Sequence, residues 1–217
     1  MHTFRDVSTA AYCPRKLYYR HRDPAADEGV PQRVRARRDL AFRYPELLDS
    51  DPEVQAAPIE VTPTQYRSRL GRLRARLDAW DALTDPAGRE VFLEGRECRG
   101  VAHKVLEDPV RPSLVFAGAP PEAGAWEPQT VRLVAAAKAL AWERETTVES
   151  AFAEYPAYGV IRRIPLTTRR KATYRSAVRT ADAIDGPPSR TPNREKCSPC
   201  DYRERCGVRT RSLRSML

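Results

Sequence analysis

Three cysteines near the C-terminus, with a fourth near the N-terminus, are the feature that most restricts how this chain can fold. Cys197, Cys200 and Cys206 follow a CxxC pattern with a third cysteine after five further residues, and Cys13 stands in the segment YCPRK. In a reducing compartment such a group is more often a metal site than a set of disulfides. Three neighbouring cysteines leave one coordination position for a remote ligand, and Cys13 is the candidate. The pattern therefore predicts a fold whose two ends meet.

The chemistry of these four thiols leaves the bound group open. Four cysteine sulfurs suit either a tetrahedral zinc ion or an iron–sulfur cluster, and the spacing does not separate the two. Unligated cysteines are the remaining alternative. Cys98 lies in a predicted strand, where a single cysteine is usually a small buried hydrophobic residue. We therefore expect Cys98 to stand apart from the other four.

The composition is that of a soluble globular protein. The chain has 217 residues, of which 41% are hydrophobic and 31% charged, enough for one substantial domain with a small appendage. No stretch approaches the roughly 20 apolar residues of a membrane span, and the first residues lack the apolar core of a signal peptide. We expect a cytoplasmic protein with no membrane partner.

Positive charge is concentrated in the last quarter of the chain. The formal net charge is +9, and residues 162–217 alone contain 15 basic and 5 acidic side chains. A nearly neutral body with a basic C-terminal part is typical of proteins that bind a phosphate backbone. A solvated surface without a nucleic-acid partner is the alternative interpretation.

Hydrophobic periodicity predicts an alternation of helices and strands. Helices are expected over residues 7–19, 33–48, 64–80, 129–144 and 168–184, and strands over 90–94, 100–106, 113–117 and 158–166. The helix at 64–80 also carries five arginines outside its apolar positions. We divide the chain into a domain of residues 1–185, with a helical part at 1–85 and a core at 86–185, and a cysteine segment at 186–217 completed by Cys13.

This order of elements resembles the RecB-like branch of the PD-(D/E)XK nuclease superfamily and, more closely, the family of CRISPR-associated iron–sulfur exonucleases. In that family an N-terminal YCPRK-type motif joins a C-terminal CxxC-x5-C to hold a 4Fe–4S cluster, and Cys13, Cys197, Cys200 and Cys206 match those positions. The resemblance implies an α/β (α+β) fold: a restriction-endonuclease-like core with a central mixed sheet flanked by helices, and a four-cysteine iron–sulfur segment formed by both ends.

The catalytic motifs of that family are not preserved. Its nucleases hold Mg²⁺ or Mn²⁺ on acidic side chains, because hard cations need oxygen ligands. The resemblance places the family's Asp at His103 and its Glu-x-Lys at Phe116 and Gly118, and its Gln-x-x-x-Tyr falls on residues 133–137. Glu107 and Asp108 are the nearby carboxylates from which a rescued site could be built. We therefore expect no confident catalytic residue, and Mn²⁺ or Mg²⁺ only if the nuclease site is active.

Three functions from different classes remain open. The first is an iron–sulfur protein without nuclease activity that binds DNA, single-stranded in preference to duplex, or a CRISPR integrase. The second is an active metal-dependent single-stranded DNA exonuclease with a diverged site, and the third is an iron–sulfur interaction or redox-sensing protein with no nucleic-acid role. Tyrosines at 18, 19, 174 and 202 lie among the basic residues, where they could stack on bases or pack around the cluster. The expected nucleic-acid contacts are Arg15, Lys16, Arg169, Arg170, Lys171, Arg175, Arg203 and Arg205.

Overall fold

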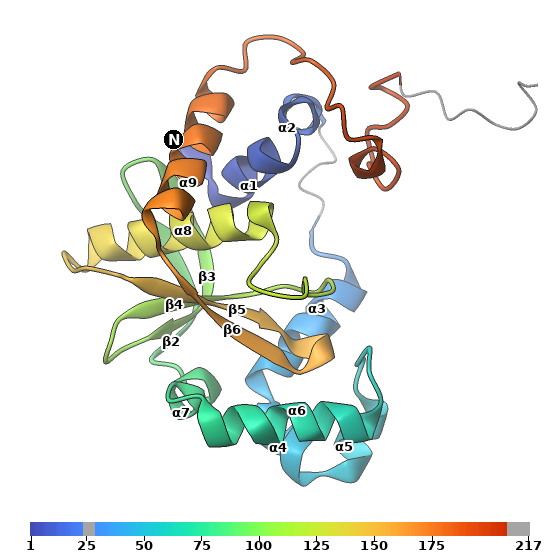
Figure 1. Cartoon of the computed structure of the whole chain (residues 1–217), viewed down its shortest axis with the longest axis vertical. Coiled ribbons are helices and arrows are strands. Elements are labelled where there is room, and N and C mark those ends of the chain that lie inside the picture. Colours follow the sequence, from blue (N-terminus) through green and yellow to red (C-terminus); the bar gives the residue numbers. More distant parts are fainter. Residues whose placement is uncertain (24–28, 208–217) are drawn as a thin grey trace, which may run out of the picture.

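A mixed β-sheet forms the centre of the protein, whose computed structural model describes residues 1–23 and 29–207 (Figure 1). Its strands are β1 (His2–Thr3), β2 (Gly88–Glu94), β3 (Cys98–Leu106), β4 (Arg111–Val115), β5 (Ser150–Tyr155) and β6 (Val160–Pro165). β3 pairs antiparallel with β2 and β4 and parallel with β1; β4 then pairs parallel with β5, and β5 antiparallel with β6. The predicted α/β fold with a central mixed sheet flanked by helices is confirmed.

Helices cover both faces of this sheet (Figure 1). They are α1 (Phe4–Tyr12), α2 (Pro14–Arg20), α3 (Gln32–Asp39), α4 (Tyr44–Asp49), α5 (Asp51–Ala56), α6 (Pro63–Arg76), α7 (Trp80–Thr84), α8 (Glu127–Glu143) and α9 (Thr168–Asp182), with 3₁₀ turns at Leu40–Phe42, Pro156–Tyr158 and Arg194–Lys196. In Figure 1, α1, α8 and α9 lie above the sheet, and α4 to α7 lie below it. No described helix is long and apolar enough to cross a bilayer.

The two layers of helices bury two separate hydrophobic clusters against the sheet. On the α8 side, Val134 and Leu140 pack with Val105 and Leu114. On the other side, the helices between residues 40 and 83 pack on Leu106, Val115 and Phe152. The N-terminal residues are therefore divided in space: α1 packs on α8 and α9, whereas the residues from 40 to 84 form the layer on the opposite face.

The first predicted helix is interrupted at Cys13. Thr3 caps α1: the Asp6 amide donates to Thr3 Oγ1 (3.0 Å) and the Thr3 amide donates to the Asp6 carboxylate (2.9 Å). Cys13 has extended backbone angles (φ −164°, ψ 111°). Pro14 favours this break because its ring restricts the preceding residue to extended conformations. α1 and α2 are therefore separate helices with a cysteine at their junction.

One central strand is absent from the sequence-based prediction. All six residues of β5 (SAFAEY) are buried, so the strand shows no alternation of apolar and polar residues. It also contains no β-branched residue, the usual mark of a buried strand. The predicted helix at 33–48 is likewise wrong in extent, since α3, a 3₁₀ turn and α4 share that region. The predicted strand at 158–166 corresponds to the shorter β6.

Candidate metal centre and nucleic-acid interface

The four predicted ligands lie together at the junction of the two chain ends. One small pocket is lined by Cys13, Cys197, Cys200 and Cys206, together with side chains of both end segments, among them Tyr12, Lys196 and Tyr202. Turns shape the C-terminal side of this pocket: the Cys200 amide donates to the Cys197 carbonyl (3.2 Å), and the Cys206 amide donates to the Tyr202 carbonyl (2.8 Å). Cys98 lies elsewhere, buried at the start of β3, where its sulfur accepts a hydrogen bond from the Tyr174 hydroxyl (3.3 Å).

The thiols share this pocket without forming a ready-made coordination sphere. Within residues 1–23 and 29–207, no three His, Cys, Asp or Glu side chains are close enough to hold a metal ion. The thiols nevertheless influence one another: burial, followed by the charges of Cys13, Cys206 and Cys200, raises the pKa of Cys197. Four thiolates gathered in this way repel one another unless a cation compensates them. The donor set therefore suits a bound cationic group, although the sulfurs must move closer to hold it.

Besides the shared cysteine pocket, hydrogen bonds and a stacked pair of rings also join the two end segments. The Tyr12 hydroxyl donates to the Lys196 carbonyl (2.9 Å), and Lys196 Nζ donates to the Tyr12 carbonyl (3.1 Å). Arg15 donates to the Pro188 carbonyl (2.8 Å), and the rings of Tyr19 and Tyr202 stack with centroids 6.1 Å apart. These contacts position the cysteine segment against α2.

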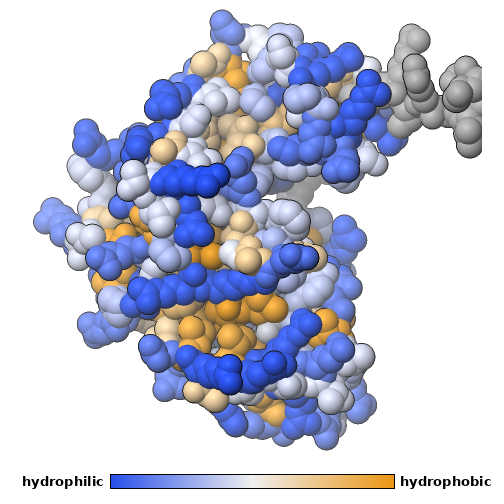
Figure 2. All heavy atoms as spheres, viewed as in Figure 1, coloured by the Kyte–Doolittle hydropathy of each residue, from blue (hydrophilic) through white to orange (hydrophobic). Residues whose placement is uncertain are grey.

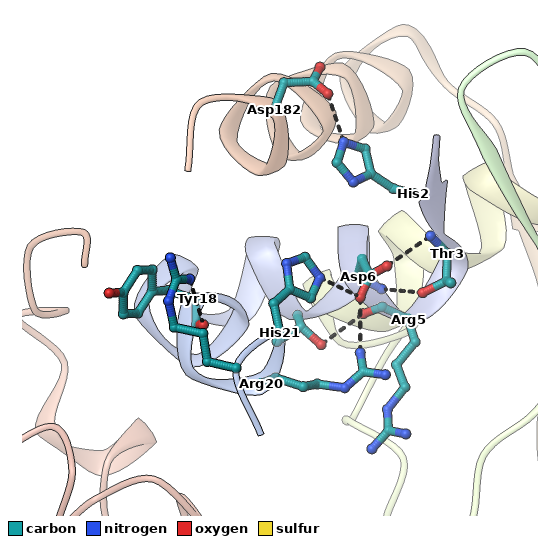
Figure 3. A network of polar contacts seen from close by, with 10 residues as sticks. His2, Thr3, Arg5, Asp6, Tyr18, Arg20, His21 and Asp182 are labelled. Carbon is teal, nitrogen blue, oxygen red and sulfur yellow. Dashed lines mark hydrogen bonds and ion pairs between the residues drawn. The ribbon is translucent and has the colours of Figure 1, made fainter. Parts of the chain in front are cut away.

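A second network, centred on Asp6, holds the helices that carry Cys13 (Figure 3). Its carboxylate accepts hydrogen bonds from Arg20 (3.1 Å) and lies 3.2 Å from His21 Nε2. Burial alone would raise the pKa of Asp6, but hydrogen bonds from Thr3 and His21 and the charge of Arg20 lower it below the ordinary value. The ionised carboxylate thus fixes the end of α2 to the start of α1.

The structure divides the predicted nucleic-acid contacts into two groups. In the first group the side chains contact other parts of the protein; it consists of Arg15, Lys16, Arg170 and Arg205. Lys16 pairs with Asp201 (3.2 Å), Arg170 donates to the Pro165 carbonyl (2.7 Å), and Arg205 lies 3.9 Å from Asp23. The second group has no side-chain partner among the described residues and consists of Arg169, Lys171, Arg175 and Arg203. The predicted tyrosines also serve packing, since Tyr174 and Tyr202 are buried.

An open groove between α6 and β6 adds basic residues that were not among the predicted nucleic-acid contacts. Arg69, Arg72 and Arg76, three and four residues apart on one face of α6, line it together with Arg162 of β6. None of the described residues that line this groove is acidic. The other arginines of α6 differ, because Arg67 and Arg74 pair with Asp51 and Asp49. Figure 2 shows hydrophilic side chains lying across hydrophobic ones on the face that carries these two elements.

The basic groove continues toward α9. Arg162 donates to the carbonyls of Gly124 (2.7 Å) and Glu122 (3.0 Å), and the guanidinium of Arg170 also lies close to Gly124. Trp126, just beyond the loop, is 52% exposed. We define the α6–β6 groove, the 122–124 loop and the start of α9 as the basic track; its arginines flank the loop, which itself carries Glu122, and Trp126 lies beside it.

The positions that correspond to the nuclease motifs carry no carboxylate. His103 is buried on β3, and its Nδ1 accepts a hydrogen bond from the Val115 amide (3.1 Å). Phe116 packs its ring on that of Tyr155, with centroids 5.7 Å apart, and Gly118 is exposed with open space around it. His103 thus contacts Val115, the last residue of β4, and Phe116 and Gly118 follow that strand in the chain.

The two carboxylates considered for a rescued site are not brought to these positions. Glu107 and Asp108 belong to the turn between β3 and β4, beyond the Leu106–Arg111 pair. Glu107 faces Arg144 (3.5 Å). Because each strand residue advances about 3.3 Å, four residues separate His103 from Glu107 by about 13 Å along the chain direction. The structure therefore does not join Glu107 or Asp108 to His103 or Phe116.

Gln129, near the start of α8, is a residue that the sequence interpretation missed. The predicted Gln-x-x-x-Tyr position at 133–137 consists of buried core residues. Gln129 instead accepts a hydrogen bond from the hydroxyl of Tyr155 (2.5 Å) and caps the helix by accepting from the Trp126 amide (3.3 Å). Gln129 lies four residues before the predicted position, so a search of the neighbouring sequence could have found it. Its tyrosine partner comes from β5, which the sequence did not reveal.

The buried His103 predicts a stability that falls in acid. Burial, followed by the charges of Arg132, Arg38 and Lys104, lowers the pKa of His103 to about 3 from its ordinary value of 6.5. Between these values the unfolded state binds more protons than the folded state, so this group should lower the free energy of unfolding by up to about 1.4 kcal/mol per pH unit as the pH falls.

The replacement His103→Asn tests this prediction, since an amide oxygen can replace Nδ1 as acceptor for Val115 without titrating. Urea unfolding of the wild type and the variant, near pH 6.5 and at acid pH approaching 3, measures how much stability each protein loses. We expect the variant to lose less stability than the wild type in acid, and equal losses would contradict the assignment.

No protein-family model matches the chain, and no curated protein does.

Proposed function

We propose that this protein carries a 4Fe–4S cluster on Cys13, Cys197, Cys200 and Cys206 and binds DNA, single strands in preference to duplex, without cleaving it. The observation that carries the proposal is that cysteines from opposite ends of the chain line one pocket. Basic side chains from α2 and from the cysteine segment line the same pocket.

The cluster would act as a cross-link between the two ends. The donors are four thiols that already share a pocket and influence one another's ionisation, and a thiolate set of this kind serves zinc and iron–sulfur clusters alike. The resemblance of both cysteine motifs to the iron–sulfur exonuclease family favours the cluster. Tyr12, Arg15 and Lys196 hold the surrounding backbone through their hydrogen bonds.

DNA binding is supported by the basic track. Its groove is lined by Arg69, Arg72, Arg76 and Arg162, with no acidic side chain from the part of the chain that the structure describes. A row of cations of this kind follows a phosphate backbone and carries no sequence information. Exposed Trp126 offers a surface on which an unpaired base can stack. This combination favours single strands, since bases in a duplex are already stacked on one another.

The absence of cleavage is supported by the residues at the nuclease positions. His103 Nδ1 is engaged by the Val115 amide, and Phe116 is buried against Tyr155. Neither residue offers the oxygen ligands that Mg²⁺ or Mn²⁺ needs. The resemblance further suggests a CRISPR integrase as a protein partner for such a binding module.

The α6–β6 groove gives a direct test of DNA binding. The double replacement Arg72→Gln/Arg76→Gln removes two groove cations, so we expect weaker binding of a single-stranded oligonucleotide. The slope of log K against log salt should fall by about 0.7 for each phosphate that is no longer neutralised. Fluorescence anisotropy over a range of salt concentrations measures both the affinity and the slope.

The same helix supplies a matched control. Arg67→Gln/Arg74→Gln changes the net charge equally, but these two arginines face Asp51 and Asp49. We expect this control to keep the wild-type salt slope. If both double variants change the slope equally, the groove is not the binding surface, and an unchanged slope in both would also contradict the proposal.

A further inference from the structure

A cavity of about 600 Å³ lies between the turn that joins β2 to β3, the C-terminal half of α8, and α9. The two helices lie on the same side of the sheet (Figure 1). The polar and aromatic side chains that line the cavity are Arg96, Glu97, Lys138, Trp142 and Tyr174. Its volume is in the range of small-molecule binding sites. The cavity shares no lining residue with the α6–β6 groove.

The β2–β3 turn is held against α8 at one wall of this cavity. The Gly95 amide donates to the Cys98 carbonyl (2.9 Å), which closes the turn. A Cβ atom at Gly95 would lie only 2.8 Å from Cα of Ala139 and 3.1 Å from its Cβ. Glycine therefore allows the backbone of the turn to approach the helix this closely. The approach places Arg96 and Glu97, the next two residues, beside the cavity.

Two cationic side chains line the cavity and contact only aromatic rings. The guanidinium carbon of Arg96 lies 5.3 Å from the ring centroid of Trp142, and Nζ of Lys138 lies 5.8 Å from that of Tyr174. Neither cation forms a side-chain hydrogen bond or an ion pair within residues 1–23 and 29–207. Their N–H groups are therefore available to a ligand, and such groups form strong, charge-assisted hydrogen bonds with phosphate.

An aromatic surface stands beside these cations. The side chain of Trp142, near the end of α8, is 56% exposed. Nucleic-acid bases stack on exposed aromatic rings and on the planes of guanidinium groups. Because Arg96 lies against Trp142, the cavity offers both kinds of surface to one planar ring.

A carboxylate completes the polar lining. Oε2 of Glu97 accepts a hydrogen bond from the Tyr174 hydroxyl (3.0 Å), which orients the side chain. Its Oε1 has no hydrogen-bond partner in the part of the chain that the structure describes. A carboxylate accepts from the amino groups that adenine, guanine and cytosine carry, and uracil has no such group. The unused acceptor therefore favours a base with an amino group.

We propose that this cavity binds a nucleoside phosphate whose base carries an amino group. The base stacks on Trp142, the phosphate accepts hydrogen bonds from Arg96 and Lys138, and the amino group donates to Glu97. Such a unit occurs as a free mononucleotide and within a nucleic-acid strand. Binding of a free mononucleotide does not depend on the DNA-binding function proposed above.

Isothermal titration with guanosine 5′-monophosphate tests this site. We expect the wild type to bind this nucleotide. Trp142→Ala and Lys138→Met should each bind it about tenfold more weakly, because one loses the stacking surface and the other a phosphate contact. Both side chains are exposed, so their replacement should leave the fold intact. Trp126→Ala and Arg99→Met are the matched controls and should keep the wild-type affinity, since both residues are exposed and neither lines the cavity.

The nature of the base is tested with uridine 5′-monophosphate, which the wild type should bind more weakly than the guanosine nucleotide. Glu97→Gln keeps an oxygen that can accept from Tyr174 but loses the carboxylate, so this variant should lose the preference. A preference that Glu97→Gln retains would contradict the choice of base. No binding by the wild type, unchanged affinity in both Trp142→Ala and Lys138→Met, or equal losses in the two controls would overturn the site.

Competition with a labelled single-stranded oligonucleotide that contains guanine separates the two sources of nucleotide. Displacement by guanosine 5′-monophosphate, with weaker oligonucleotide binding in Trp142→Ala, assigns the site to a nucleotide within a strand. Oligonucleotide binding that neither the mononucleotide nor Trp142→Ala changes assigns it to free nucleotides. Mononucleotide binding without any oligonucleotide binding would refute the DNA-binding function and leave this site standing. Oligonucleotide binding without mononucleotide binding would refute this site alone.

Discussion

Replacing Lys104 by Met should lower the free energy of unfolding by about 3–5 kcal/mol, because it leaves a buried carboxylate without its partner. Lys104 and Glu154 are both fully buried. Lys104 Nζ donates to the carbonyls of Ala41 (2.6 Å) and Leu83 (2.8 Å) and to the Glu154 carboxylate (2.9 Å). All three ammonium protons are therefore used, and the lysine connects the lower layer of helices to the centre of the sheet.

The double variant Lys104→Met/Glu154→Leu distinguishes a charge left unpaired from a loss of packing. Removing both charges should restore a large part of the stability, since a hydrophobic pair of similar volume is often as stable as a buried ion pair. Lys138→Met, on the exposed side of α8, is the control and should change little. Chemical denaturation gives the values. A loss below about 1 kcal/mol for Lys104→Met would contradict the network.

Cys13→Ser and Cys200→Ser should each remove most of the bound iron and the visible absorption from anaerobically prepared protein. They should also loosen both chain ends, because a metal site built from remote ligands contributes its binding energy to folding. Limited proteolysis should then cut first between residues 186 and 207, where few apolar side chains are buried.

Cys98→Ser is the matched control for these cysteine variants. Cys98 is buried beside Tyr174, apart from the other four, so its replacement should leave the iron content unchanged. Equal iron content in all three variants would contradict the assigned ligands. If the purified protein contains zinc and no iron, the four assigned ligands stand and the proposed iron–sulfur cluster is refuted.

The sequence predicted those parts of the site that depend on local spacing. The cysteine triplet and the YCPRK segment could be paired because each motif is short and chemically unusual, and the structure places their thiols in one pocket. Local patterns also predict helices: the apolar residues of α6 recur at helical spacing, and α8 is rich in alanine and begins with Glu127 and Pro128, which are typical of a helix start.

The parts that the sequence did not reveal depend on contacts between distant segments. β5 was missed because its short run of small and buried residues lacks periodicity. The missing strand also concealed Glu154, the partner of Lys104, and Tyr155, the partner of Gln129. The groove between α6 and β6 and the arginines around His103 likewise come from separate elements, so no window of sequence contains them.

The most direct test of the whole account is one incubation read in two ways. Cluster-loaded protein is mixed with end-labelled single-stranded and duplex DNA in Mn²⁺, Mg²⁺ or a chelator, and both the length and the gel mobility of the DNA are measured. The account predicts intact DNA in every sample and a salt-sensitive mobility shift that is stronger for single strands. Metal-dependent shortening that Glu107→Ala or Asp108→Ala abolishes, or the absence of any shift, would contradict it.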